Sequence, residues 1–399
     1  MRHRTFFILF WSLFALFIVG LLLGDLSPID QRYVIFNAGD DFLADFLQQI
    51  RYVWDRNPYF DDRTPLLEHI YPPLAYLPIY PISMIFHGRF PQIPTLQELQ
   101  SDGLAVLLGL TFSIASALIL FTLIFSAAGK RKSVASLLPL VLSGITLFSV
   151  ERANLIWIAA FGVAGFFLLH DSSDPRRKTL AALSISLAAS IKIFPIIALF
   201  VWLNKKDLKW FLIAGICTCT FGFLPLFFFQ HAPIENTLQL IANVSDQGKY
   251  YFLHCFHSSI TIPAYVCGVL RLFSPTLEES IRLGIRIPFA TCGLICLFVI
   301  LKRNLRIWER IFLLASAFTL ISNLSMYYTT LYFLPAIYLY LRDEPSDTLF
   351  DVLFAILLTP FQLFVPTYNG YAFSIAPFTA SLVIFTITAR IVMSHLRST

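Results

Sequence analysis

The sequence predicts an all-α protein that crosses a membrane many times. Of its 399 residues, 57% are hydrophobic and only 13% are charged, and the mean hydropathy is +0.72. A soluble globule of this length needs more polar surface than such a composition supplies. Long apolar runs also alternate with short polar breaks, and a spanning helix needs about 20 apolar residues. We therefore expect one integral membrane domain over residues 1–399.

About twelve membrane segments can be laid out along the chain. The first, 5–23, follows three polar residues and has no small-residue cleavage site, so we expect a retained span rather than a secretion signal. The expected segments are 5–23, 103–128, 134–150, 154–169, 179–191, 193–203, 210–229, 284–301, 311–322, 329–341, 348–366 and 374–392.

Two pairs of these segments are too short to cross a bilayer alone at a rise of about 1.5 Å per residue. They are 179–191 with 193–203, and 311–322 with 329–341. We expect broken helices there. Non-helical backbone at membrane depth is tolerated only where protein or a water-filled cavity covers it, so such breaks tend to lie beside a site.

Basic residues indicate the sidedness of the chain. With both termini inside, 18 of the 29 Lys and Arg fall on the cytoplasmic side, in clusters such as Arg176 to Lys178. This is the positive-inside pattern. It predicts a multi-pass protein of a cell membrane, expected to be a bacterial cytoplasmic membrane, with outer loops at about 24–102 and 230–283. Within these loops, 71–86 and 260–273 are apolar and are expected to be interfacial or re-entrant.

The first outer loop is strongly acidic. Residues 25–102 hold 11 of the 24 Asp and Glu against 5 Arg and no Lys. In it, Asp40 and Asp41 precede a stretch, 41–47, whose apolar positions recur at helical spacing. One aspartate could act as a general base. Alternatively, Asp40 is a helix N-cap and Asp41 a first-turn carboxylate.

Lys192 is an isolated cation between two apolar half-helices. Charges at or near membrane depth are costly and usually mark a ligand, a partner carboxylate or a path. A phosphate contact is one interpretation; a lysine that reaches the lipid headgroups, or an internal salt bridge, are the others. Arg152 and Asn154 lie in a charged outer turn, which could equally be a solvated turn.

Other polar residues of the outer loops are candidate substrate contacts. Tyr59 and Tyr71 lie beside prolines that stiffen the first loop. His254 and His257 have a spacing that two metal ligands can share, but no third ligand is evident and we expect no metal. Cys255 and Cys267 could pair, although buried free thiols are the simpler interpretation. The +5 net charge comes in short clusters without a basic face, which argues against nucleic acid as a partner.

Together these pieces resemble the GT-C class of multi-spanning glycosyltransferases, and within it glycosyltransferase family 87. The motifs that carry the resemblance are Gly39-Asp40-Asp41-Phe42, Asn57-Pro58-Tyr59, Tyr71-Pro72-Pro73-Leu74, Asn154 in its turn, Ile191-Lys192-Ile193-Phe194-Pro195 and the stretch from Ser325 to Pro335. The family's Gly-Gln-x-Asn turn appears here as Glu151-Arg152-Ala153-Asn154.

The resemblance implies a GT-C-like fold and an inverting transferase. Its donor would be a mannose- or arabinofuranose-like sugar linked to polyprenyl phosphate, and its acceptor a lipid or a glycan of the cell envelope. Asp41 or Asp40 would be the base, and Lys192 would hold the donor phosphate with help from Arg152 or a histidine. No cofactor is expected, and the chain has no Gly-rich phosphate loop.

Two other functions fit the same features. In a transporter or flippase of lipid-linked substrates, Lys192 and the broken helices would line a path. No inverted repeat is detectable, however, and the polar residues gather on one face. A noncatalytic scaffold for envelope assembly would explain the loops but not the isolated lysine.

Overall fold

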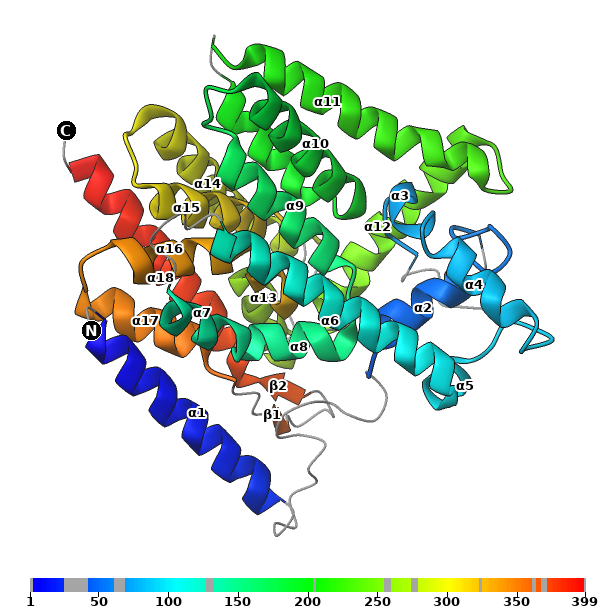
Figure 1. Ribbon diagram of the computed structural model, residues 1–399, viewed down its shortest axis with the longest axis horizontal. Coiled ribbons are helices and arrows are strands. Elements are labelled where there is room, and N and C mark those ends of the chain that lie inside the picture. Colours follow the sequence, from blue (N-terminus) through cyan, green and yellow to red (C-terminus); the bar gives the residue numbers. More distant parts are fainter. Residues whose placement is uncertain are drawn as a thin grey trace. The chain divides into compact units, whose positions relative to one another are not determined.

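The computed structural model (Figure 1) is built almost wholly of helices. It describes residues 3–24, 42–60, 69–126, 133–203, 206–254, 260–273, 279–322, 325–360, 364–366 and 372–397. Asp40, Asp41, Cys255 and His257 lie outside these ranges, so the expectations that rest on them lie outside the described residues.

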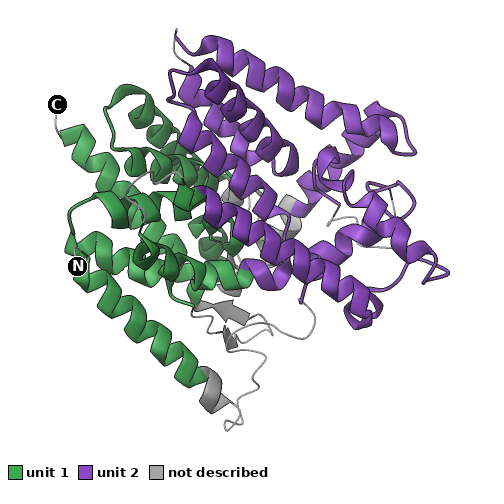
Figure 2. Cartoon of the chain, viewed as in Figure 1, with its two compact units in different colours: residues 1–39, 124–148, 251–399 green, residues 40–123, 149–250 purple. Residues whose placement is uncertain are grey.

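The chain forms two compact units, coloured separately in Figure 2. Unit 1 comprises residues 1–39, 124–148 and 251–399, and unit 2 comprises residues 40–123 and 149–250. Each unit is therefore assembled from separate segments of the chain. Of the candidate site residues described below, Asp45, Tyr59, Tyr71, Arg152, Asn154 and Lys192 belong to unit 2, and His254 belongs to unit 1.

The helices up to residue 254 belong mostly to unit 2, although α1 and α7 belong to unit 1. The helices of this part of the chain are α1 (Arg4–Gly24), α2 (Ala44–Tyr52), α3 (Pro73–Tyr76), α4 (Tyr80–His87), α5 (Leu96–Ser101), α6 (Gly103–Ser126), α7 (Val134–Val141), α8 (Gly144–Arg152), α9 (Ile156–Leu169), α10 (Pro175–Ile191), the 3₁₀ helix η3 (Phe194–Trp202), α11 (Leu208–Phe223), the 3₁₀ helix η4 (Leu224–Phe228) and α12 (Pro233–His254).

The second half supplies most of unit 1. Its elements are α13 (Ile262–Phe273), α14 (Glu279–Lys302), α15 (Ile307–Ile321), the 3₁₀ helix η6 (Tyr327–Phe333), α16 (Leu334–Asp343), α17 (Thr348–Leu358), the strands β1 (Phe364–Pro366) and β2 (Ala372–Ser374), and α18 (Ile375–Arg397). The two short strands pair antiparallel. These strands were not expected. Within the expected segment 348–366, helix α17 ends at Leu358, and β1 covers Phe364–Pro366.

Four helices of the described chain are long and apolar enough to cross a membrane. They span 103–126, 208–228, 283–302 and 376–397. A bent pair formed by α7 and α8 would make a fifth span, and shorter apolar helices cover 4–20, 156–169 and 348–358. The helical membrane class is thus supported, while the number of twelve segments stays a prediction.

Both expected helix breaks are present. Helix α10 ends at Ile191, and η3 begins at Phe194, so Lys192 lies in the break. Pro195 explains the break, because its ring would collide with the Ile191 carbonyl if the α-helix continued. In the other pair, α15 ends at Ile321 and η6 begins at Tyr327.

The expected segment 134–150 is bent rather than one straight helix. Helices α7 and α8 meet there at an angle of 51°. Ser143 and Thr146 cap the ends at the bend, since both hydroxyls donate to the Leu140 carbonyl, at 2.8 and 2.7 Å. Gly144 is required at this corner because a Cβ would lie 2.6 Å from the Pro360 Cα.

The small residues of α9 bring it close to α10. A Cβ on Gly162 would lie 2.6 Å from the Ser184 carbonyl oxygen, and one on Gly165 would lie 3.0 Å from the Ser184 Oγ. Small residues allow such close backbone approach inside membranes. Helices α9, α10 and α11 therefore pack side by side (Figure 1). This layer positions the turn before α9 and the break after α10.

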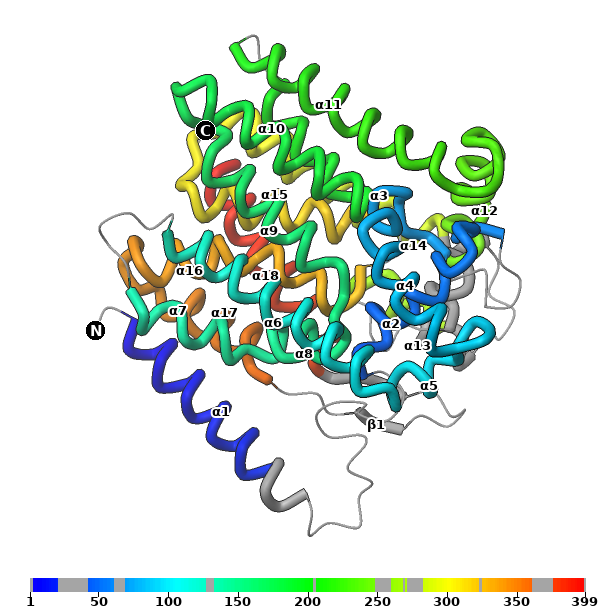
Figure 3. Tube along the Cα trace, turned by 45° about the vertical axis from the view of Figure 1, so that its right-hand side comes forward, coloured from blue at the N-terminus to red at the C-terminus, as the bar shows by residue number. Residues whose placement is uncertain are grey.

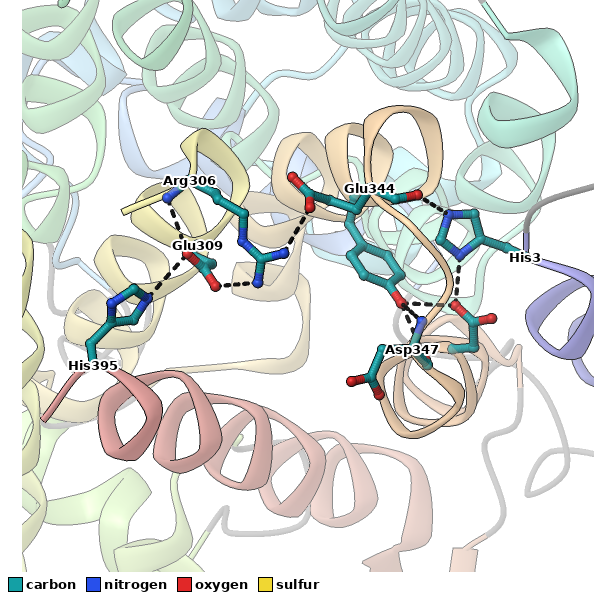
Figure 4. A network of polar contacts seen from close by, with 8 residues as sticks. His3, Arg306, Glu309, Glu344, Asp347 and His395 are labelled. Atoms are coloured by element: carbon teal, nitrogen blue, oxygen red, sulfur yellow. Dashed lines mark hydrogen bonds and ion pairs between the residues drawn. The ribbon is translucent and has the colours of Figure 1, made fainter. Parts of the chain in front are cut away.

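A polar network in unit 1 joins side chains from near both ends of the chain (Figure 4). His3 Nδ1 lies 2.7 Å from the buried Asp351 carboxylate, and Arg306 donates to Glu344 at 2.7 Å and pairs with Glu309. His395 in turn lies 3.3 Å from Glu309. Residues near both ends of the chain thus meet in one network. The placement of both termini on the cytoplasmic side stays a prediction.

Candidate functional site

A cluster of polar and charged side chains gathers in unit 2 from five parts of the chain. Asp45 lies in the first turn of α2, and Tyr71 lies just before α3. Arg152 ends α8, Asn154 lies in the turn before α9, and Lys192 follows the last residue of α10. We call these five residues the Asp45 cluster.

Three hydrogen bonds converge on the Asp45 carboxylate. Arg152 donates from Nε to Oδ2 and from Nη2 to Oδ1, both at 2.9 Å. Asn154 Nδ2 donates to Oδ2 at 2.6 Å. The side chain of Asp45 is 13% exposed and that of Arg152 is 20% exposed. A planar, bidentate pair of this kind fixes the guanidinium in both position and orientation.

Asn154 links this pair to the rest of the cluster. Its Nδ2 also donates to the Tyr71 hydroxyl at 3.2 Å, while its Oδ1 accepts the Ile156 backbone N–H at 2.7 Å and so caps the start of α9. The Lys192 ammonium lies over the Tyr71 ring, 3.9 Å from its centroid. A cation so close to an aromatic face is attracted by the ring's quadrupole. This contact holds Lys192 against Tyr71, which Asn154 in turn links to Asp45.

Asp45 is ionised in this setting. Burial by itself raises the pKa of its carboxyl, but the Arg152 guanidinium, the hydrogen bonds from Arg152 and Asn154 and the Lys192 ammonium together outweigh burial. The net effect holds the pKa of Asp45 below its ordinary value. A carboxylate that already accepts three hydrogen bonds is a poor proton acceptor, so Asp45 is suited to hold its neighbours.

The backbone beside the cluster adopts an unusual conformation. Leu43 and Ala153 have φ values of 55° and 50°, in the left-handed region that non-glycine residues rarely adopt. The Leu43 N–H donates to the Glu151 carbonyl at 2.7 Å, so the turn before α2 is tied to the last turn of α8. Backbone strain of this kind costs about 1–3 kcal/mol and gathers at functional sites.

Tyr59 lies behind the cluster. It is fully buried, and its hydroxyl donates to the Tyr71 carbonyl at 3.0 Å. Asn243 of α12 donates to the carbonyls of Tyr59 and His69, each at 3.2 Å. In this structure Tyr59 supports Tyr71; a direct substrate contact through Tyr59 stays a prediction.

The structure brings together four of the residues that the sequence singled out. These are Tyr71, Arg152, Asn154 and Lys192. The two proposed bases, Asp40 and Asp41, and His257 lie outside the described residues. His254 ends α12, but its side chain is also outside the description.

The short helix of the first loop begins later than expected. Helix α2 begins at Ala44, its N-cap position is Leu43, which makes no side-chain cap, and its first-turn carboxylate is Asp45. The alternative in which Asp40 and Asp41 cap a helix lies outside the described residues. The short helix itself was expected, but three residues earlier.

The sequence alone did not distinguish Asp45, because the adjacent aspartates Asp40 and Asp41 precede it and are more conspicuous. A signal was nevertheless present. Arg152 and Lys192 are cations at apolar segments and require a counter-charge, and Asp45 falls between the apolar positions Ala44 and Phe46 that α2 buries.

An apolar cavity of about 280 Å³ lies beside the cluster within unit 2. Phe46, next to Asp45 in the chain, and Ile158, in the first turn of α9, both line it. The remaining lining comes from α4, α6 and the turn before α4, and Thr111 is its single polar residue. Among the described residues, no group of three His, Cys, Asp or Glu side chains is arranged to hold a metal ion.

Comparison with known proteins identifies the family. No curated protein and no solved structure gives a significant match. The model of glycosyltransferase family 87 matches residues 69–331, which is more than half of the chain and contains Tyr71, Arg152, Asn154 and Lys192. The resemblance expected from the motifs is thus confirmed, and the chain belongs to glycosyltransferase family 87.

Proposed function

We propose that this glycosyltransferase takes its sugar from a polyprenyl-phosphate donor and transfers it with inversion to a lipid- or glycan-linked acceptor, on the outer face of the cytoplasmic membrane. The transferred sugar would be mannose- or arabinofuranose-like. The observation that carries the proposal is the Asp45 cluster, in which two cations and one carboxylate meet in a largely buried site.

The charges of the cluster suit such a donor. Arg152 is cationic and Asp45 is anionic, so with Lys192 protonated, the form that a bound phosphate favours, the three side chains carry one net positive charge. A sugar joined to a prenol through one phosphate carries one negative charge. Low solvent exposure strengthens an attraction between the two, because less water screens it.

The apolar cavity supports a lipid-linked substrate. Isoprenoid chains are apolar, and all but one of the cavity's lining residues are apolar. Its position next to Phe46 would let a chain lie in the cavity while its phosphate reaches the cluster.

The reaction needs one base and one stabilised leaving group. In a single in-line displacement, a carboxylate takes the proton of the acceptor hydroxyl as its oxygen bonds to the anomeric carbon. The bond between that carbon and the phosphate oxygen breaks, and its electron pair leaves with the phosphate. Lys192 would stabilise the developing charge. Because Asp45 is already engaged, Asp41 or Asp40 remains the proposed base.

The base is tested with Asp41→Asn and Asp40→Asn. Each variant is assayed in membranes with a radiolabelled polyprenyl-phosphate sugar. Loss of transfer is expected in one of the two. Asp102→Asn is the control, since the Asp102 carboxylate is engaged elsewhere, where it caps α6 and pairs with the exposed Arg89. Transfer at the wild-type rate by both variants would reject this assignment.

The role of Lys192 is tested with Lys192→Met. Its KM for the donor is expected to rise several-fold more than its KM for the acceptor. Lys209→Met is a matched control, because Lys209 is an exposed lysine that also lies over an aromatic ring, that of Trp210. Equal effects on the two substrates, or none, would favour a lysine that reaches the lipid headgroups.

A further inference from the structure

Helix α12 exposes apolar side chains and buries polar ones, which is the reverse of a helix on the surface of a soluble protein. Along its first part, Ile234, Leu238 and Ile241 are 70%, 63% and 60% exposed. The buried positions are instead amides: Asn236 is 0% exposed and Asn243 is 3% exposed. A helix at a water-facing surface normally buries its apolar face and exposes its polar one.

The side chains of α12 fall into sectors around its axis. At about 100° per residue, positions 234, 238 and 241 lie within about 60° of one another, and Asn236 and Asn243 lie on the opposite side. The exposed acidic residues Glu235 and Asp246 lie on one flank between them, about 100–120° from position 234. The sectors thus face three environments.

The inner sector is committed to the protein. Asn243 holds the carbonyls of Tyr59 and His69, and Asn236 donates to the His231 carbonyl at 2.8 Å. Because Asn243 ties one side of α12 to another part of unit 2, and Asn236 is buried on the same side, the apolar sector faces outward. Contiguous exposed aliphatic residues on one helix mark a contact with a protein or a membrane.

The surface beside this sector favours the membrane. Segment 208–228, formed by α11 and η4, is a candidate span and is the least buried of the four. Leu224 and Phe227 at its end are exposed, and α12 begins only a few residues later (Figure 3). The apolar sector of α12 thus follows closely, in the sequence, a candidate membrane span whose end also exposes apolar side chains.

We propose that α12 lies at the boundary between bilayer and water, with Ile234, Leu238 and Ile241 in the acyl chains and Glu235 and Asp246 toward water. Through Asn243, this lipid-bound helix holds Tyr59 and His69, and through the hydrogen bond from Tyr59 to Tyr71 also the Asp45 cluster, at the membrane surface. The part of α12 whose side chains are described, 233–247, contains no Lys or Arg to attract anionic headgroups, and Lys249 comes only later in the helix, so we place this part against acyl chains. The proposal does not depend on the proposed function.

Spin labelling of the full chain tests this placement. Single cysteines at 238, 241, 235 and 246, in a variant whose six native cysteines are replaced by alanine, are labelled with a nitroxide in phosphatidylcholine vesicles. Labels at 238 and 241 should collide more with oxygen, which concentrates in lipid, than with a water-soluble nickel complex. Labels at 235 and 246 should show the reverse.

Other results would overturn the proposal. Labels at 238 and 241 that meet the nickel complex as often as those at 235 would place the face in water. Low collision with both reagents, together with spin–spin broadening, would mean that a second copy covers it. A strict requirement for anionic lipid would contradict an acyl-chain contact.

If the cysteine-free chain does not fold, the wild-type background still gives the answer. The photo-crosslinking residue p-benzoylphenylalanine replaces Leu238, or Glu235 as the control, and adducts are identified by mass spectrometry. Lipid adducts at 238 but not at 235 are expected, and peptide adducts alone at 238 would reject the lipid contact.

Discussion

Asp45 accepts three hydrogen bonds from two side chains, and these contacts decide what each member of the cluster can do. Arg152 and Asn154 come from the end of one helix and the turn before the next, and Asp45 joins them to α2. Removing one partner of a mostly buried ion pair leaves the other charge unsatisfied, which costs about 3–5 kcal/mol when burial is complete and less here because both side chains are partly exposed.

Asp45→Asn should therefore impair catalysis without abolishing the fold. The new amide would face the donors of Arg152 and Asn154, so both side chains lose their orientation. We expect kcat for sugar transfer to fall about tenfold or more, equivalent to about 1.4 kcal/mol. The KM for the donor should change less, since the net positive charge of the cluster increases. Wild-type kcat in Asp45→Asn, with Asp102→Asn as the control, would contradict a positioning role.

The lowered pKa of Asp45 also predicts a pH dependence of stability. A carboxyl whose pKa is lower in the folded than in the unfolded state stabilises the fold above its unfolded-state pKa, about 4, and loses that contribution as pH falls through the folded-state value. The difference in Tm between wild type and Asp45→Asn should thus be constant from neutral pH to about pH 5 and shrink below about pH 4. Thermal unfolding in detergent measures it. A gap that widens in acid would reject this account.

Much of the site could be predicted from the residue type at single positions of the sequence. Lys192 and Arg152 were conspicuous because charge near membrane depth is costly. Asp45 was not, because an aspartate in an amphipathic stretch has many ordinary explanations, and only the fold shows that it meets Arg152. The 51° bend after α7 was equally hidden, since its cause is a close contact between Gly144 and the distant Pro360.

At the scale of elements, the packing of α9 on α10 sets the distance between Asn154 and Lys192. Asn154 precedes α9, and Lys192 follows α10. The contact at Gly162 is against a backbone oxygen, which cannot move aside as a flexible side chain can.

Gly162→Ala should consequently lower both stability and transfer. We expect a loss of about 1–3 kcal/mol from overpacking, seen as a lower Tm in detergent. Gly215→Ala in α11 is the matched control, because nothing lies within 4 Å of its Cβ position and alanine favours helix by about 1 kcal/mol. A Gly162→Ala protein as stable as Gly215→Ala would show that the two helices need not approach so closely.

The hydrogen bonds from Asn243 of α12 to the residues that support the cluster lead to a second prediction at this scale. Asn243→Leu removes the donor to the Tyr59 and His69 carbonyls, which leaves buried acceptors unsatisfied at about 1–3 kcal/mol. A lower Tm and reduced transfer are expected. Ser245→Leu, an exposed polar-to-apolar change on the same helix, should leave both unchanged or improved. Equal behaviour of the two variants would remove the proposed link.

At the scale of the molecule, composition alone was enough to predict the helical membrane class, since so few charged residues cannot coat a soluble protein. The broken helices at Lys192 and after Ile321 followed from segment length. The grouping of the chain into two units could not be predicted, because each unit joins segments that are interrupted in the sequence by a segment of the other unit.

The central claim is that this family 87 glycosyltransferase uses a lipid-linked donor at the Asp45 cluster. The most direct measurement offers the purified full chain, in vesicles, either a radiolabelled polyprenyl-phosphate sugar or the corresponding nucleotide sugar, with membrane lipid extract as acceptor. We predict labelled product from the polyprenyl-phosphate sugar, strongly reduced in Lys192→Met but not in Lys209→Met. Transfer from the nucleotide sugar alone, or equal transfer by both lysine variants, would contradict the account.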